Sequence, residues 1–389
     1  MILHICDDNV FFKEIFLQFE IAAPGLSTYI INKPGYLNIK AYTNNKNVLL
    51  TENIIENIDN VLMNNKNIKI IIIHGLTNEK VKIVNRYYQK YKFLWVFWGA
   101  DGLYLNRFKN KWFSQETRVL LKINKIITIS LVSAIKNLFS NTILYQLFYY
   151  LCKGKYNSDY EKVLAIKRMN YIAPVIPDDY YLLRSKIKVN AQLVPFSIGS
   201  LNTLAPIKKM TVETGGNILL GNSADPSNNH IDVLKLLKKY KYDRKVFCPL
   251  SYGDTNYRSI LVKEGIKLLS HNFIPLFKFL PLEKYHEIIN SCDIVVMNHY
   301  RQQAMGTIIS ALYQGKKVFL NDKNYAKRYF ERIGVKTYSV QKALVSTILN
   351  NDFKEINRIK VNNMKQLEKH YSHEAVIHKT KALIDIVLA

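Results

Sequence analysis

The sequence predicts an α/β protein built of two Rossmann-like domains that are joined by a linker. Three observations lead to this prediction. The chain has 389 residues, and a single hydrophobic core usually stops growing below that size. Short apolar runs alternate with helix-like stretches in both halves of the chain, which is typical of parallel sheets covered by helices on both faces. A polar stretch with several prolines and glycines separates the halves, as expected of a linker.

The N-terminal domain is expected over residues 1–195. Its strands and helices are expected to alternate at 2–5, 10–20, 28–31, 53–63, 68–73, 78–89 and 93–98. A basic and aromatic stretch with a helical pattern follows at 107–168, where twelve Lys or Arg residues accompany only three acidic ones. The linker is expected over residues 196–216.

The C-terminal domain is expected over residues 217–389. Its strands and helices are expected to alternate at 218–221, 230–240, 246–248, 282–290, 294–297, 307–314, 318–320 and 325–333. The last stretch, residues 341–388, has a helical pattern and can cross back over the first domain.

The chain carries 55 Lys and Arg against 30 Asp and Glu, a formal net charge of +25. Such a charge attracts polyanions or anionic lipid. The basic stretch at 107–168 has three interpretations: a solvated helical surface, a face that binds the membrane interface, or a groove that binds nucleic acid. Aromatic residues interleaved with its lysines favour the membrane interface among the functional interpretations. No nucleic-acid-binding motif accompanies it, so no nucleic-acid partner is expected.

Neither a secretion signal nor a membrane-spanning helix is expected. The N-terminus reaches Asp7 and Asp8 without a basic segment followed by a long apolar run. The most apolar candidate, 126–152, is interrupted by Lys136 and by three amide side chains, whereas a spanning helix needs about 20 largely apolar residues. The four cysteines are far apart and form no CxxC motif, so we expect them to be reduced and buried.

Two loops of the C-terminal domain follow expected strands, where open parallel sheets bind their ligands. The first, residues 221–230 (GNSADPSNNH), precedes a helix. Its small and polar residues can cap that helix and offer amides and hydroxyls to a ligand, although an ordinary capped turn has a similar composition. The candidate ligand contacts in this loop are Asn222, Ser223, Asn228 and His230.

The second loop, residues 298–307 (NHYRQQAMGT), also joins a strand to a helix. A helix N-terminus with an arginine beside it is suited to hold a diphosphate. The alternative is an ordinary loop whose arginine is solvated. The candidate ligand contacts here are Arg301, Gln302, Gln303, Gly306 and Thr307.

In the N-terminal domain, ionisable residues stand just after three expected strands. His74 follows the run 68–73, Asp101 follows the run 93–98, and Asp8 follows the first strand. Each can serve as a general base for an acceptor hydroxyl. Each can also be structural, since a strand-end His is often a buried, satisfied residue and an Asp after Gly often forms a turn.

Four segments resemble glycosyltransferase family 56, the TDP-N-acetylfucosamine:lipid II N-acetylfucosaminyltransferases of enterobacterial common antigen synthesis. They are GNSADPSNNHID at 221–232, RQQAMGT at 301–307, HG at 74–75 and WGAD at 98–101. The resemblance extends over residues 70–325. It implies a GT-B fold, in which two Rossmann-like domains face each other across a central cleft. It also implies a TDP-amino-sugar donor in the C-terminal domain and an undecaprenyl-diphosphate-linked acceptor at the N-terminal domain.

The sequence therefore predicts a glycosyltransferase that moves an N-acetylfucosamine (Fuc4NAc-type) sugar from a TDP-sugar to a polyprenyl-diphosphate-linked saccharide. We expect peripheral attachment to the anionic cytoplasmic face of the inner membrane. The chain lacks the Asp-x-Asp pair that usually holds a divalent cation on such a diphosphate, so neither a metal nor a cofactor is expected. It also lacks the Glu-x7-Glu signature of many retaining GT-B enzymes.

Two alternatives stay open from the sequence. One is a GT-B transferase that uses a UDP- or GDP-linked sugar for capsule or O-antigen assembly. The other, outside the enzyme class, is a non-catalytic module that binds glycans or polyanions.

Overall fold

A computed structural model of the chain describes residues 1–8, 11–32, 45–105, 108, 111–121, 158–205 and 215–389. The chain divides into two compact units. Unit 1 comprises Met1–Phe108, Ile127–Ser200 and His373–Ala389, and unit 2 comprises Lys109–Ile126 and Leu201–Ser372. Each unit contains one parallel sheet in its described part.

Unit 1 contains a seven-stranded parallel sheet in its described residues, in the order β3-β2-β1-β4-β5-β6-β7. The strands are β1 (Ile2–Asp7), β2 (Ser27–Asn32), β3 (Val48–Thr51), β4 (Ile70–His74), β5 (Lys92–Phe97), β6 (Tyr171–Pro174) and β7 (Gln192–Leu193). β4 is buried along its whole length. A continuous run of isoleucine suits such a strand, because both of its faces are covered.

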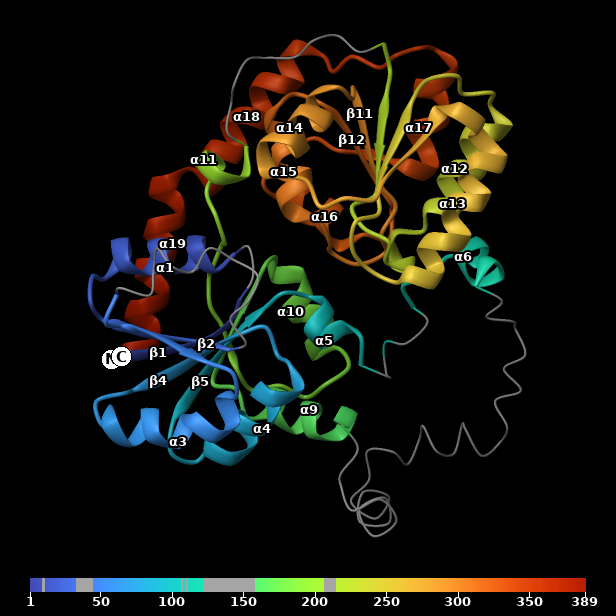
Figure 1. The fold of residues 1–389 in the computed structure, drawn as a ribbon. Helices are drawn as coiled ribbons and strands as arrows, with labels where there is room; N and C mark the ends of the chain where they lie inside the picture. The colour runs from blue at the N-terminus through green and yellow to red at the C-terminus, as the bar shows by residue number, and fades with distance from the viewer. Residues whose placement is uncertain (9–10, 33–44, 106–107, 109–110, 122–157, 206–214) are drawn as a thin grey trace, which may run out of the picture. The chain divides into compact units, whose positions relative to one another are not determined.

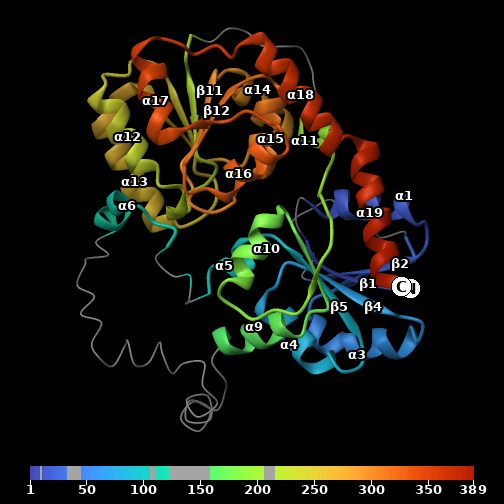
Figure 2. The same cartoon turned by 180° about the vertical axis from the view of Figure 1, so that it is seen from behind.

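Helices cover both faces of this sheet (Figures 1 and 2). Those of the described residues are α1 (Phe12–Ala22), α3 (Ile54–Asn64), α4 (Asn78–Tyr87), α5 (Ala100–Leu103), α9 (Ser158–Lys167), α10 (Pro177–Arg184) and α19 (His373–Leu388). α1 and α19 lie together on one face, and α3 and α4 lie on the other (Figures 1 and 2). The starts of α3 and α4 are fixed by side-chain caps from Asn53 and Thr77.

The C-terminal helix α19 belongs to unit 1, although the sequence runs through unit 2 before reaching it. Its Leu383 and Val387 share a core with Phe19 of α1. The Gln18 amide of α1 donates hydrogen bonds to the Thr380 hydroxyl at 2.6 Å and to a backbone carbonyl at 2.8 Å. The crossing that the helical pattern allowed is thus built on an apolar seam with a buried polar contact.

Unit 2 contains a six-stranded parallel sheet in its described residues, in the order β10-β9-β8-β11-β12-β13. The strands are β8 (Ile218–Leu220), β9 (Val246–Pro249), β10 (Phe273–Leu276), β11 (Ile294–Met297), β12 (Lys317–Leu320) and β13 (Tyr338–Ser339). The helices of the described part are α6 (Gln115–Leu120), α11 (Leu201–Leu204), α12 (His230–Lys239), α13 (Thr255–Leu269), α14 (Leu282–Asn290), α15 (Met305–Tyr313), α16 (Tyr325–Arg332), α17 (Val340–Leu349) and α18 (Asn357–Tyr371).

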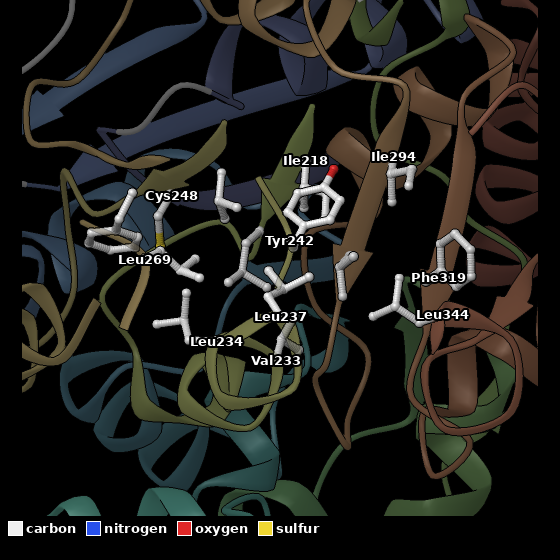
Figure 3. Packing of buried hydrophobic residues seen from close by; sticks show 14 of the residues in the cluster. Ile218, Val233, Leu234, Leu237, Tyr242, Cys248, Leu269, Ile294, Phe319 and Leu344 are labelled. Atoms are coloured by element: carbon white, nitrogen blue, oxygen red, sulfur yellow. The ribbon is translucent and has the colours of Figure 1, made fainter. Parts of the chain in front are cut away.

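The sheet of unit 2 is also covered on both faces. α12 and α13 lie on one side of it, and α14 and α15 lie on the other (Figures 1 and 2). Figure 3 shows Leu234 and Leu237 of α12 pointing toward the strands, below Cys248 and Ile218. All four side chains are fully buried, and burial of each such leucine contributes about 1.5–3 kcal/mol.

Residues 109–126, which the sequence analysis placed in the first domain, are part of unit 2. In the described part of this segment, α6 packs against α12. The Ser114 amide donates to the Asn229 side chain at 2.8 Å, and Lys235 of α12 pairs with Glu116 of α6. The chain later passes from unit 1 to unit 2 between Ser200 and Leu201, within the stretch expected as the linker.

Three of the four cysteines, Cys6, Cys248 and Cys292, are buried free thiols, and burial raises their pKa values. Cys152 and most of the basic stretch at 107–168 lie outside the described residues. Within the described ranges, no helix is both long and apolar enough to cross a bilayer.

Candidate functional site

The sheet of unit 2 reverses its strand order between β8 and β11. β8 pairs with β9 on one side and with β11 on the other, so the chain builds the sheet outward in one direction and then in the other. Loops that leave the carboxyl ends of two such strands diverge and form a crevice. The loops that follow β8 and β11 are the two that the sequence analysis selected.

Gln303 joins these two loops directly. Its side-chain amide donates to the Asn222 side-chain oxygen at 2.9 Å, and its side-chain oxygen accepts from the Ser227 hydroxyl at 2.9 Å. Asn222 and Gln303 are both partly exposed. The structure thus brings together residues that are about 80 positions apart in the sequence.

Arg301 lies at the same edge but is only 4% exposed. Its Nη1 donates to the Gln302 carbonyl at 2.8 Å, and its charge acts on the nearby groups His299 and Tyr252. The alternative of a solvated arginine is therefore not what the structure shows. Gln302 is buried to the same extent.

A buried polar network lies beneath Asn222. The side-chain oxygen of Asn228 accepts from the Asn222 backbone amide at 3.0 Å and from His299 Nε2 at 2.7 Å. His299 therefore carries its proton on Nε2, because an amide oxygen can only accept. Burial, followed by the charge of Arg301, lowers the pKa of His299 well below its usual range, so its ring is neutral. The network fixes the backbone of Asn222 without adding a charge.

Gly221 allows this network to close. Its φ is +69°, and a Cβ there would lie 2.4 Å from His230 Nε2 and 2.7 Å from Asn228 Oδ1. Nδ1 of the same histidine is 3.0 Å from the Tyr257 hydroxyl, and burial lowers the pKa of His230 to about 3. Ser223, Asn228 and His230 are each at most 1% exposed. They therefore support the loop from below, whereas Asn222 faces outward.

Gly306 and Thr307 lie in the first turn of α15, whose preceding residue Ala304 has the left-handed φ of +59°. The Thr307 hydroxyl is 3.3 Å from the hydroxyl of Tyr285 on α14. A Cβ on Gly306 would have only one neighbour within 4 Å among the described residues, at 3.5 Å. The positive end of α15 is thus open next to the two loops, in the manner of sites that hold anionic groups.

Tyr252, in the loop that follows β9, was not among the site residues predicted from the sequence. Its hydroxyl accepts from the Asn222 side-chain amide at 2.8 Å, and the residue is 53% exposed. The segment around it, SYGD, matches no motif, so only the pairing of β9 with β8 reveals its position.

In unit 1, strand order reverses between β1 and β4, and His74 lies there at the end of β4. Its Nε2 is 3.0 Å from Nδ1 of His4, and Nε2 of His4 is 3.2 Å from the Ser27 hydroxyl. Burial lowers the pKa of His4 to about 3, and burial, His4 and Lys80 together lower that of His74. Both rings are neutral, and Nδ1 of His74 has no hydrogen-bond partner in the described part of the chain.

A buried lysine ties the ends of β1 and β4 together. Lys80 is 0% exposed, and its ammonium donates to the Asp7 carboxylate at 2.7 Å and to the His74 carbonyl at 2.6 Å. The next residue, Asp8, is half-buried at the same edge. This arrangement fixes the backbone on either side of the switch point.

Asp101, the third candidate base, is used to hold the loop that follows His74. Its Oδ2 accepts from the Leu76 amide at 2.9 Å and from the Trp95 indole at 2.7 Å. Burial is the main cause that raises the pKa of Asp101. These contacts favour a supporting part for Asp101 over direct proton transfer.

No group of three or more His, Cys, Asp or Glu side chains within the described residues is arranged to hold a metal ion. The expectation of a metal-independent reaction remains a prediction.

Comparisons with known proteins agree with the fold. The family model described as 4-alpha-L-fucosyltransferase, glycosyl transferase group 56, matches residues 136–378, which is more than half of the chain. Three solved structures are similar over nearly the whole length of both chains. A glycosyltransferase from Rickettsia africae ESF-5 is 15% identical, with a TM-score of 0.62, and the match covers 100% of this chain and 98% of that one.

Anabaena Alr3699/HepE, solved in complex with UDP, is 11% identical, with a TM-score of 0.65 and coverage of 99% and 100%. Sucrose-phosphate synthase from Thermosynechococcus elongatus is 9% identical, with a TM-score of 0.61 and coverage of 100% and 99%. At such identities the similarity concerns the fold alone. The fold is GT-B, with one Rossmann-like sheet in each unit.

Proposed function

Because the chain belongs to glycosyl transferase group 56, the 4-alpha-L-fucosyltransferase family, it is a glycosyltransferase, and we propose that its donor is a TDP-linked N-acetylfucosamine (Fuc4NAc-type) sugar. The proposed acceptor is a saccharide linked to polyprenyl diphosphate, and the product is an intermediate of surface polysaccharide such as enterobacterial common antigen. We further propose that the reaction occurs at the cytoplasmic face of the inner membrane, to which the chain attaches peripherally.

The observation that carries the donor site is the hydrogen bond between Gln303 and Asn222 across the switch point of unit 2. It places Asn222, Arg301 and the open first turn of α15 at one edge of the sheet. A diphosphate there would meet main-chain amides, the positive helix end and a guanidinium. Stabilisation of the charge that develops on the departing nucleoside diphosphate would be the main catalytic contribution.

On the acceptor side, the base is proposed to come from the β1–β4 edge of unit 1. The acceptor hydroxyl oxygen would attack the anomeric carbon, the bond from that carbon to the diphosphate would break, and the hydroxyl proton would pass to the base. Nδ1 of His74 and Oδ1 of Asp101 both have no hydrogen-bond partner in the described part of the chain. His74 is favoured, because the carboxylate of Asp101 already holds the loop through Leu76 and Trp95, and moving it to accept a proton would disturb that loop. Asp8 stays a candidate.

The proposed membrane association rests on charge and on the nature of the acceptor. The net charge of +25 would attract an anionic lipid surface, where each well-placed cation contributes about 1 kcal/mol. A polyprenyl-linked acceptor resides in that surface, so attachment would raise its local concentration.

The test is transfer by the purified full-length chain from TDP-, UDP- and GDP-linked sugars to a polyprenyl-diphosphate-linked acceptor in vesicles of anionic lipid. We expect a product with the TDP-linked sugar alone, in amounts that a metal chelator does not change. Transfer from UDP- or GDP-linked sugars only would replace the proposed donor. Nucleotide binding without transfer to any lipid-linked acceptor would contradict the proposed acceptor, and activity that disappears with the chelator would contradict the metal-independent mechanism.

A further inference from the structure

We propose that Tyr252 is the platform on which the nucleobase of the donor stacks. This inference rests on the proposed function, in which unit 2 takes a nucleoside-diphosphate sugar at its β8–β11 edge. It adds the residue that recognises the nucleoside part, which neither the motifs nor the comparisons indicate.

The position of Tyr252 follows from the sheet. β9 is the neighbour of β8 on the side away from β11, so the loop after β9 runs beside the loop after β8. The Tyr252 hydroxyl accepts from the Asn222 side chain at 2.8 Å. The charge of Arg301 also acts on this hydroxyl. Tyr252 is therefore adjacent to both loops that are proposed to hold the diphosphate.

The backbone around Tyr252 is fixed to the loop after β8. The Ala224 amide donates to the Tyr252 carbonyl at 2.7 Å, and the Asp254 amide donates to the Ala224 carbonyl at 3.1 Å. Gly253 has a φ of +114°, and a Cβ there would lie 2.6 Å from the Ala224 carbonyl carbon. The close approach of these two loops requires glycine at this position.

An anchored but exposed ring is unusual. Tyr252 is held at its hydroxyl and at its backbone, yet it is 53% exposed. Tyr257, five residues later, also bonds a side chain of the loop after β8, but it is 0% exposed and belongs to the core. Core packing therefore accounts for the position of Tyr257. It does not account for the exposed part of the Tyr252 ring, which a ligand can contact.

The surroundings favour a flat apolar partner on this side of the site. The loop that follows β10, the next strand outward, carries Phe277 and Phe279, which are 51% and 69% exposed. If the diphosphate lies at the β8–β11 edge, the ring of Tyr252 is within reach of the attached nucleoside. A nucleobase presents a planar π face, and stacking on an aromatic side chain contributes about 1–3 kcal/mol per base.

The experiment measures by calorimetry the affinity of the full-length chain for TDP and for inorganic pyrophosphate. We expect Tyr252→Ala to weaken TDP binding about 5- to 150-fold, which corresponds to the stacking energy. Pyrophosphate binding should stay within about twofold, which also shows that the variant is folded. Tyr252→Trp and Tyr252→Phe should bind TDP within a few-fold of wild type, because both retain an aromatic face.

The matched control is Tyr181→Ala, which removes a tyrosine of unit 1 that is 59% exposed and should not change TDP binding. Equal TDP affinity of Tyr252→Ala and wild type would overturn the inference. So would a loss that appears with the complete TDP-sugar but not with TDP, because the ring would then contact the sugar. If wild type binds none of TDP, UDP and GDP, the proposed function fails and the inference fails with it.

Discussion

Gly221→Ala tests whether the network beneath Asn222 is as tightly packed as the structure shows. The added Cβ would be 2.4 Å from His230 Nε2 and 2.7 Å from Asn228 Oδ1, at a φ of +69°. The left-handed backbone costs an L-residue about 1–2 kcal/mol, and overpacking of a core adds about 1–3 kcal/mol. The expected loss of stability is therefore about 2–5 kcal/mol, and for a domain of this size each kcal/mol lowers Tm by about 2–4 °C.

The matched control is Gly215→Ala, in the same unit. Gly215 has a φ of +66°, but a Cβ there would have no neighbour within 4 Å among the described residues. This variant therefore carries the cost of the left-handed backbone without the cost of overpacking. Calorimetric melting of the two variants measures the difference. We also expect Gly221→Ala to weaken TDP binding, because His230 and Asn228 must move and Asn228 holds the Asn222 amide. Equal Tm values for the two variants would refute this reasoning.

Three further predictions concern the two edges. Gln303→Ala removes two hydrogen bonds between the loops, each worth about 0.5–1.5 kcal/mol, so the TDP affinity measured by calorimetry should fall about 5- to 150-fold. An unchanged affinity would show that donor binding does not depend on this link between the loops. His74→Gln should lower kcat about 100- to 10,000-fold in the transfer assay while TDP affinity, which depends on unit 2, stays constant; an unchanged kcat would exclude His74 as the base. The free energy of unfolding, measured with urea, should fall as the pH drops from about 6.5 toward 3, because the folded pKa values of His4 and His230 are about 3 and the unfolded chain binds the protons first. This pH dependence should be weaker in His4→Asn and His230→Asn. A dependence equal to that of wild type would contradict the burial of neutral rings.

Local pattern was sufficient to predict the strands and the loops that carry the candidate site. Residues 70–73 are four isoleucines in a row, and a run of this kind has few alternatives to a strand buried on both faces. The loops at 221–230 and 298–307 were identified because small and polar residues follow apolar runs. These signals depend on neighbours in the sequence, which is why they could be interpreted without the structure.

Contacts that depend on strand order could not be predicted in this way. The link between Gln303 and Asn222 exists because β11 pairs with β8, and periodicity carries no information about that pairing. The Ser114 amide donates to the side chain of Asn229, which lies 115 positions later in the sequence. Because periodicity cannot show such a contact, the segment around Ser114 was assigned to the first domain, although it is part of unit 2. Tyr252 was missed for the same reason, since a lone tyrosine in a turn has no local signature.

The structure also divides the candidate donor residues into two layers with different effects on the reaction. Asn228 accepts two hydrogen bonds, from the Asn222 amide and from a neutral His299, and these groups lie below the exposed edge. A neutral layer of this kind fixes the positions of the amides and adds no charge of its own next to Arg301. Fixed dipoles stabilise a developing charge without reorganising during the reaction. The loss of activity caused by changes in the buried layer should therefore appear in kcat as well as in donor affinity, whereas a change of the exposed ring of Tyr252 should act mainly on affinity.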